Sequence, residues 1–214
     1  MIISKPQQLP ESQPLSDSAT FATAEDVAGV AFVGARFSEI DRSHLSVQSC
    51  SFTSCLFAGG ALPKSQFSDV VFRNCDLSNA DWRGCSFHRV EFVDCKLMGT
   101  NLCEVTWNNV SLVNCKAELA NFTSGRMRVV SFDHALMRSA AFDECRFERV
   151  EFVHCDLAMA EFHRTRLKNI SLADSDIRGI RVGEIDSFEL KGLIISQLQA
   201  LDLVRLLGVE IEDA

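Results

Sequence analysis

The chain lacks the features that would place it in a membrane or on nucleic acid. No stretch of its 214 residues approaches the roughly 18 uninterrupted apolar residues that a membrane span needs. Residues 1–20 lack the charged and long apolar regions of a signal peptide. Basic residues are outnumbered, so the net charge is −8 at pH 7 and the summed field repels nucleic-acid phosphates. We therefore expect a cytoplasmic protein with no membrane contact and no direct nucleic-acid partner.

The sequence also lacks the spacings of metal sites and catalytic centres. None of its nine cysteines forms a CxxC pair, and no Ser-His-Asp arrangement, phosphate loop or pair of catalytic carboxylates stands out. His134 and His154 lie twenty residues apart without a third candidate ligand, which predicts a surface pair. An odd number of cysteines in a large chain without an export signal indicates reduced thiols. We expect no cofactor, no bound metal and no enzymatic activity.

Apolar residues recur every five positions, a period of neither an α-helix nor a β-strand. Every fifth residue from Val47 to Val182 is apolar, 28 residues in all, and at an apolar content of 47% chance gives such a run about once in a billion trials. A second series, at the position two residues before each of these, also repeats every five residues from Cys50 to Ile180 and contains no charged residue. Eight of the nine cysteines occupy it, and only Cys103 falls at an outward position. Both positions are therefore predicted to face a common core.

The second position also repeats every twenty residues. Its clearest columns are Val70, Val90, Val110, Val130, Val150 and Ile170; Cys55, Cys75, Cys95, Cys115, Ala135 and Cys155; and Ala80, Thr100, Ala120, Ala140 and Ala160. Four five-residue segments then close one square coil, and successive coils stack at the strand spacing of about 4.8 Å. The pattern predicts a solenoid of about seven coils, near 34 Å long.

The units CDLSN, ADWRG, CSFHR, ANFTS and CDLAM resemble those of the pentapeptide-repeat family over about residues 30–190. The resemblance implies an all-β fold, a right-handed quadrilateral β-helix, here followed by a short C-terminal α-helix. We divide the chain into an extended or disordered lead over 1–20, expected along the first coil, a β-helix over 21–192, and a capping and dimerisation helix with tail over 193–214. Arg42 takes an inward position, which predicts a slipped or irregular coil between Glu39 and His44.

The C-terminal segment carries helix signals. Ser196 followed by Gln199 is a capping-box pattern, and Gly208 is placed as a C-cap, so we predict a helix over about 197–207. Its apolar residues cover more than one face, which is more than closing the last coil requires. We therefore expect a partner there, and we assign the dimer contact to Leu198, Leu201, Val204 and Leu207.

This tail, with the stretches DIRGI and VRLLG, is similar to the quinolone-resistance (Qnr) branch of the family. That resemblance implies a homodimer joined end to end through the C-termini. It also implies binding to the type II topoisomerases, DNA gyrase and topoisomerase IV, by a rod that imitates DNA and protects the enzyme from quinolones. The unbroken register leaves no room for a projecting loop, so the chain resembles the loopless members more. A repeat scaffold for another protein, or immunity against a topoisomerase-directed toxin, are the alternatives.

Outward charges divide unevenly among the four sides of the predicted rod. Three sides are named after the inward column that precedes them, and the fourth after its charge. Each side consists of four residues that recur every twenty positions: the Val face begins with 71–74 and ends with 171–174, the Cys face runs from 76–79 to 176–179, the Ala face from 81–84 to 181–184, and the basic face from 66–69 to 186–189. From residue 70 onward, their net charges are −4, zero, −3 and +4. The candidate topoisomerase-facing residues are Glu91, Asp94, Asp133, Glu151 and Asp174 on the Val face, and Asp81, Glu104, Asp143, Glu144, Glu161 and Glu184 on the Ala face. Charges spread only for solubility are the alternative interpretation.

Overall fold

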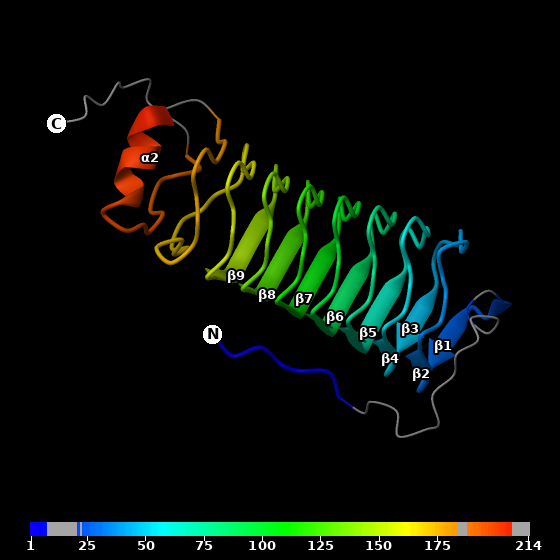
Figure 1. The fold of residues 1–214 in the computed structure, drawn as a ribbon. Helices are drawn as coiled ribbons and strands as arrows, with labels where there is room; N and C mark the ends of the chain where they lie inside the picture. The colour runs from blue at the N-terminus through cyan, green and yellow to red at the C-terminus, as the bar shows by residue number, and fades with distance from the viewer. Residues whose placement is uncertain (8–20, 22, 184–187, 207–214) are drawn as a thin grey trace.

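The chain coils into a four-sided rod of parallel strands (Figure 1). The computed structural model describes residues 1–7, 21, 23–183 and 188–206. Its strands are β1 (Asp26–Ala28), β2 (Ala31–Val33), β3 (Ser46–Gln48), β4 (Ser51–Thr53), β5 (Gln66–Arg73), β6 (Ser86–Val93), β7 (Thr106–Val113), β8 (Arg126–Asp133) and β9 (Arg146–Val153). They pair in the order β1-β3-β5-β6-β7-β8-β9, with β2 joined to β4 and β4 to β5.

A shift of twenty residues relates each strand to the next. Phe72 pairs with Phe92, and Val90 with Val110, all in parallel register. The five eight-residue strands carry the basic face and the Val face together, whereas short bridges such as Asp76 to Lys96 join the coils on the other two sides. The predicted right-handed quadrilateral β-helix with its twenty-residue coil is confirmed.

The corners of the rod are residues in the left-handed backbone region. A positive φ recurs at nearly every fifth residue, for example 52° at Asn74, 55° at Asn79 and 54° at Asp94. Asn and Asp tolerate this region better than most residues do. Val129, a β-branched residue, has a φ of 56°, a conformation that persists only where surrounding contacts impose it.

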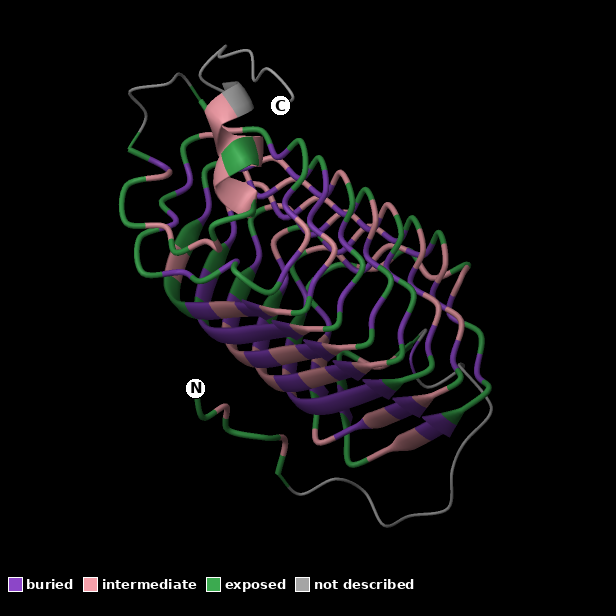
Figure 2. Ribbon diagram, turned by 60° about the vertical axis from the view of Figure 1, so that its left-hand side comes forward, coloured by how far each residue is buried: buried purple, intermediate pink, exposed green. Residues whose placement is uncertain are grey.

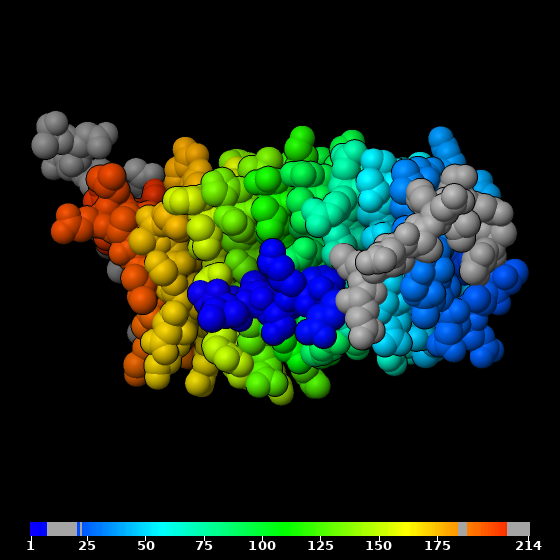
Figure 3. All heavy atoms as spheres, turned by 90° about the horizontal axis from the view of Figure 1, so that it is seen from below, coloured from blue at the N-terminus to red at the C-terminus, as the bar shows by residue number. Residues whose placement is uncertain are grey.

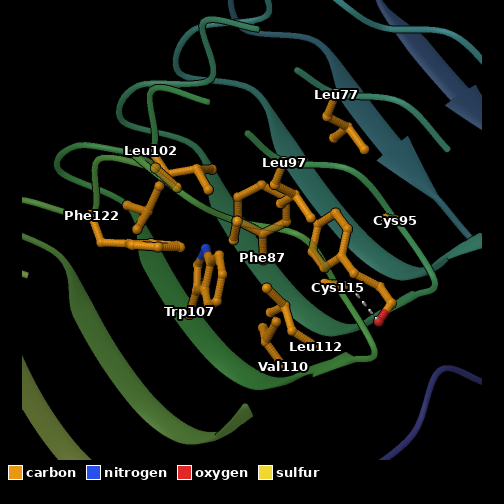
Figure 4. Close-up of a cluster of buried hydrophobic side chains, with 14 of the residues drawn as sticks. Leu77, Phe87, Cys95, Leu97, Leu102, Trp107, Val110, Leu112, Cys115 and Phe122 are labelled. Carbon is orange, nitrogen blue, oxygen red and sulfur yellow. Dashed lines mark hydrogen bonds between the residues drawn. The ribbon is translucent and has the colours of Figure 1, made fainter. Parts of the chain in front are cut away.

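The two inward positions build one continuous core (Figure 2). Phe52, Phe72 and Phe92 stack in a column with centroid distances of 4.9 and 4.8 Å and nearly parallel rings. Trp107 is fully buried and meets the edge of Phe122 at 5.6 Å (Figure 4). The predicted inward orientation of both positions is thus confirmed across these coils.

The eight inward cysteines are buried thiols that bond to the preceding coil. Cys75 Sγ donates to Phe52 O at 3.4 Å, and Cys115 Sγ donates to Phe92 O at 3.5 Å. Burial raises the pKa of the Cys85 thiol to about 12. These cysteines act as small core residues, because a thiol with so high a pKa is a poor nucleophile at neutral pH.

The prediction of a slipped coil at Arg42 is wrong. Arg42 N donates to Ala61 O at 2.9 Å and Asp41 bridges to Ala61, so the twenty-residue register holds there. Arg42 does occupy an inward slot. Its Nη1 donates to Phe21 O at 3.0 Å and to Ala24 O at 2.6 Å, which gives the charged group partners at the end of the rod without displacing the coil.

The predicted C-terminal helix is present as α2 (Gln199–Leu206). Ser196 N donates to Gln199 Oε1 at 2.8 Å and Gln199 N donates to Ser196 Oγ at 3.4 Å, so the capping box forms. Residues 197 and 198 form a turn, and α2 therefore begins two residues later than predicted. Gln199 Nε2 also donates to Leu172 O at 2.7 Å, which anchors the helix on the last coil. Gly208 lies outside the described residues.

Across the residues that the structure describes, no helix combines the length and apolar character needed to cross a bilayer.

Replacing Phe92 by Asp should abolish folding, because Phe92 is 0% exposed and a buried carboxylate without a partner costs several kcal/mol. Val93→Asp is the matched control, since Val93 is the next residue of β6 and points outward. We expect Val93→Asp to keep a cooperative melt and the circular dichroism of a β-protein. A cooperative melt in Phe92→Asp would contradict the inward assignment.

Candidate protein-binding faces

The predicted acidic residues lie at the surface on two opposite sides of the rod. The ten that fall within the described residues are all half-buried or exposed; Glu184 lies outside them. The two sides are separated by the Cys face on one flank and the basic face on the other. The sequence therefore predicted correctly which way these ten side chains point, but the two acidic sides differ in what surrounds them.

On the Ala face, most carboxylates already have basic partners. Arg164 Nη1 lies 2.9 Å from Glu144 Oε1, and Arg181 Nη1 lies 2.7 Å from Glu161 Oε1. The Arg83 guanidinium holds the pKa of Asp81 below its usual range. Exposed pairs of this kind stabilise the fold little.

Glu104 is the exposed carboxylate of the Ala face that has no ion pair among the described residues. It follows Cys103, whose thiol is half-buried and has a pKa raised mainly by burial. Glu104 therefore offers an exposed negative charge that no ion pair among the described residues neutralises.

Asp143, Glu161 and His163 form the one group in the described part of the chain whose spacing would suit a metal ion. Their ligand atoms lie within 4.8 Å of one another. However, His163 Nδ1 is 3.0 Å from Asp143 Oδ1, and Glu161 accepts from Arg181. The three side chains thus belong to the polar network of the Ala face.

The N-terminal residues run along the edge that the Val face shares with the basic face (Figure 3). Residues 1–7 run extended across the coils instead of along the first coil, where we had expected them. Gln7 N donates to Asp69 Oδ1 at 2.9 Å and Ser4 N donates to Asn109 Oδ1 at 3.0 Å. Lys5 Nζ lies 3.7 Å from Glu91. We call residues 1–7 the N-terminal strap.

The strap changes what the Val face can offer a partner. Glu91 and Glu151 both contact it, the latter through the N-terminal ammonium at 3.4 Å. Asp94 and Asp174 remain exposed at the other edge, where Asp94 accepts from Asn114 and Asp174 lies 3.7 Å from His154. The two histidines are an exposed pair with ring centroids 5.0 Å apart, as predicted.

Asp69 holds the end of the strap. It is 7% exposed in its side chain, and Arg89 Nη2 lies 2.5 Å from its Oδ2. The Arg89 guanidinium, followed by the Gln7 amide, keeps the pKa of Asp69 below its usual range. Arg89 also contacts the His88 ring. This contact has no periodic signal in the sequence, because Lys5 and Gln7 lie outside the repeats.

The C-terminal end of the rod exposes an apolar patch. Leu198 is 82% exposed, Leu201 52% and Ile194 51%, whereas Leu203 packs against the core. Val204 is half-buried, and Leu207 lies outside the described residues. Ile194, which bridges to Ser171, is a member of this patch that sequence reasoning missed, because the helix signals begin only after it.

Asp69→Asn should release the strap and lower the free energy of unfolding by about 2 kcal/mol at pH 7, because it removes a charged hydrogen bond from a nearly buried site. Since the folded-state pKa of Asp69 is lowered, its contribution is complete above an unfolded pKa of about 3.9 and disappears as the pH falls through the folded value. The stability difference from the wild type should therefore shrink in acid.

Amide hydrogen exchange measures the release of the strap directly. We expect the Ser4 and Gln7 amides to exchange faster in Asp69→Asn and to be unchanged in the control Asp94→Asn, whose side chain accepts from Asn114. Equal exchange of the Gln7 amide in all three proteins would show that Asp69 does not hold the strap.

Two family models match the repeats. The model of a pentapeptide repeat region matches residues 85–153, and that of pentapeptide repeats in eight copies matches residues 65–103 and 131–179. Together they extend over residues 65–179, more than half of the chain.

Solved structures also align with the chain. One is a trypsin-treated QnrB1, a plasmid-mediated fluoroquinolone resistance protein, at 19% identity and a TM-score of 0.39, covering 87% of this chain and 100% of that one. Another is HetL, a pentapeptide repeat protein involved in heterocyst differentiation regulation from the cyanobacterium Nostoc, at 16% identity and a TM-score of 0.40, covering 80% of this chain and 90% of that one. No curated protein matches the chain.

Proposed function

Because the chain belongs to the pentapeptide-repeat family, we propose that it is a protein-binding rod whose partner is a bacterial type II topoisomerase, DNA gyrase or topoisomerase IV. In this proposal the rod occupies the surface on which the enzyme holds duplex DNA, and so protects the enzyme from quinolones. The observation that carries it is a filled rod whose Ala face carries carboxylates in four coils, at 81–84, 101–104, 141–144 and 161–164, and is not covered by another described segment.

We assign docking to the Ala face. A basic DNA-binding surface attracts a row of carboxylates in the way that it attracts phosphates. The Val face has a larger net negative charge, but the strap covers one edge of it and brings Lys5 to Glu91. The basic face would be repelled by the same surface. We therefore expect one-sided binding, through the acidic face that the strap does not touch.

Purified protein should change gyrase supercoiling at micromolar concentration and reduce its inhibition by ciprofloxacin. Glu104→Lys should raise the concentration needed for half of this effect by about tenfold, because it reverses an exposed charge of the docking face that has no ion pair among the described residues. Asp94→Lys on the Val face and Glu148→Lys on the basic face make the same charge change and should leave the effect within about twofold.

The wild type and the three variants test the identity of the partner and the choice of docking face separately. A wild-type protein without effect on supercoiling, with or without the drug, would remove the topoisomerase proposal. Loss of the effect in Asp94→Lys but not in Glu104→Lys would move docking to the Val face.

We further propose that two rods join end to end through the C-terminal apolar patch. This patch exposes the apolar side chains of Leu198, Leu201 and Ile194 to water. It lies beside a helix that is already anchored to the last coil through Gln199. Burial of this area against its symmetry mate would place the same residues together near a two-fold axis. A doubled rod would also present two Ala faces to a two-fold symmetric partner.

Leu201→Glu should convert the dimer into a folded monomer, because each copy brings a buried charge close to its mate. We expect the dimer dissociation constant to rise about thirtyfold or more. Leu119→Glu is the matched control, because Leu119 is 63% exposed and lies on the Cys face away from the end of the rod. Sedimentation measures the mass, and a wild type that sediments near the 23.8 kDa of one chain at tens of micromolar would reject the dimer.

A further inference from the structure

The basic face carries a row of three arginines that have no acidic partner in the part of the chain that the structure describes. Arg126 and Arg146 lie opposite each other in register on β8 and β9, and Arg166 follows twenty residues later in the next coil. All three are exposed. Arg128 differs, because its Nε lies 3.3 Å from Glu148 Oε1. Like charges directly opposite one another destabilise neighbouring strands, so this row reduces the stability of the rod.

The row borders a series of shallow depressions with apolar side chains in them. The first depression lies between Arg126 and Arg146 and reaches Met127 and Phe147. The second contains Arg146, Phe147 and Arg166 and ends at Phe188. Phe147 is only half-buried although it stands at an inward position, and Phe188 is 46% exposed. We call this surface the arginine groove.

Two lysines extend the positive charge beyond the row. Lys168 and Lys191 line a third depression, which shares Arg166 and Phe188 with the second. Neither lysine has an ion pair among the described residues. The Arg166 guanidinium lies over the Phe188 ring, 5.2 Å from its centroid, and this contact holds a cation against an apolar surface at the middle of the groove.

We propose that the arginine groove binds an extended acidic segment of a partner protein, one in which carboxylates stand among apolar side chains. Arginine pairs with carboxylates through two parallel hydrogen bonds, and the row presents one guanidinium in each coil, about every 4.8 Å. Apolar side chains of the segment would bury Phe147 and Phe188. Binding would also remove the repulsion within the row.

The charges beside the groove favour a peptide over nucleic acid. The basic face lies between the Val face and the Ala face, which carry net charges of −4 and −3. Their repulsion acts over about 8 Å at physiological ionic strength. A nucleic acid, with a charge on every nucleotide, would meet both acidic flanks. A peptide with a few carboxylates needs only the width of the groove.

Fluorescence anisotropy tests the proposal with a labelled twelve-residue peptide of four Glu-Leu-Glu units and the full-length protein. We expect saturable binding to the wild type, and at least a tenfold weaker association in Arg146→Glu, because Arg146 borders both depressions and its charged hydrogen bonds are lost. Lys116→Glu, the same charge change at an exposed site on the Cys face, should bind within about twofold of the wild type.

Three outcomes would overturn the proposal. Absence of binding to the wild type at 100 µM or so would show that the groove is only a solvated surface. Equal weakening in Lys116→Glu and Arg146→Glu would show that net charge, and not the groove, attracts the peptide. Tighter binding of a labelled twelve-nucleotide oligothymidine than of the peptide would assign the groove to single-stranded nucleic acid. All variants should retain the wild-type circular dichroism, since the substituted residues are exposed.

Discussion

The backbone hydrogen bonds between coils are the constraint on which the rest of the structure depends. Each coil must return to the same place after twenty residues, as where Asp76 N donates to Cys55 O at 3.0 Å and Asp81 N donates to Gly60 O at 2.9 Å. This return requires a change of direction after every five residues, which a left-handed corner residue provides. Val129 and Leu119 adopt this conformation, with φ of 56° and 60°, although neither residue type favours it. The bonds between coils therefore determine the corner conformation even where local preference opposes it.

The same constraint separates the inward from the outward residues. Inward side chains stack on identical positions 4.8 Å away, which suits flat rings such as Phe72 on Phe92 and small groups such as the Cys75 thiol on its neighbours. Outward side chains contribute almost nothing to this packing. Their charges can differ from side to side without loss of the fold, which is why a rod of one repeat can have two acidic faces, a neutral face and a basic face. Function in such a rod is a property of its outward residues.

The sequence predicted the coil because the core and the register follow one short period. The prediction failed where a residue outside that period, or a polar residue within it, found a partner elsewhere in the chain. Arg42 suggested a slipped coil, but its guanidinium bonds to the carbonyl groups of Phe21 and Ala24 and the ladder stays in register. The strap has no signal in the repeat pattern, since Lys5 contacts Glu91, 86 positions further along the chain, and Gln7 contacts Asp69, 62 positions further along. Contacts made once, without repetition, cannot be deduced from a period.

A count of charges along the sequence ranks the Val face as the more acidic side, and the strap alters that ranking. Lys5 and the N-terminal ammonium lie against Glu91 and Glu151, so part of the field of that face is neutralised at short range. The charge of the Ala face is instead paired within the face, through contacts such as Arg164 with Glu144, and is not covered by another segment in the described part of the chain. Both acidic faces are therefore partly neutralised, and they differ in access, because the strap covers an edge of the Val face alone among the described residues.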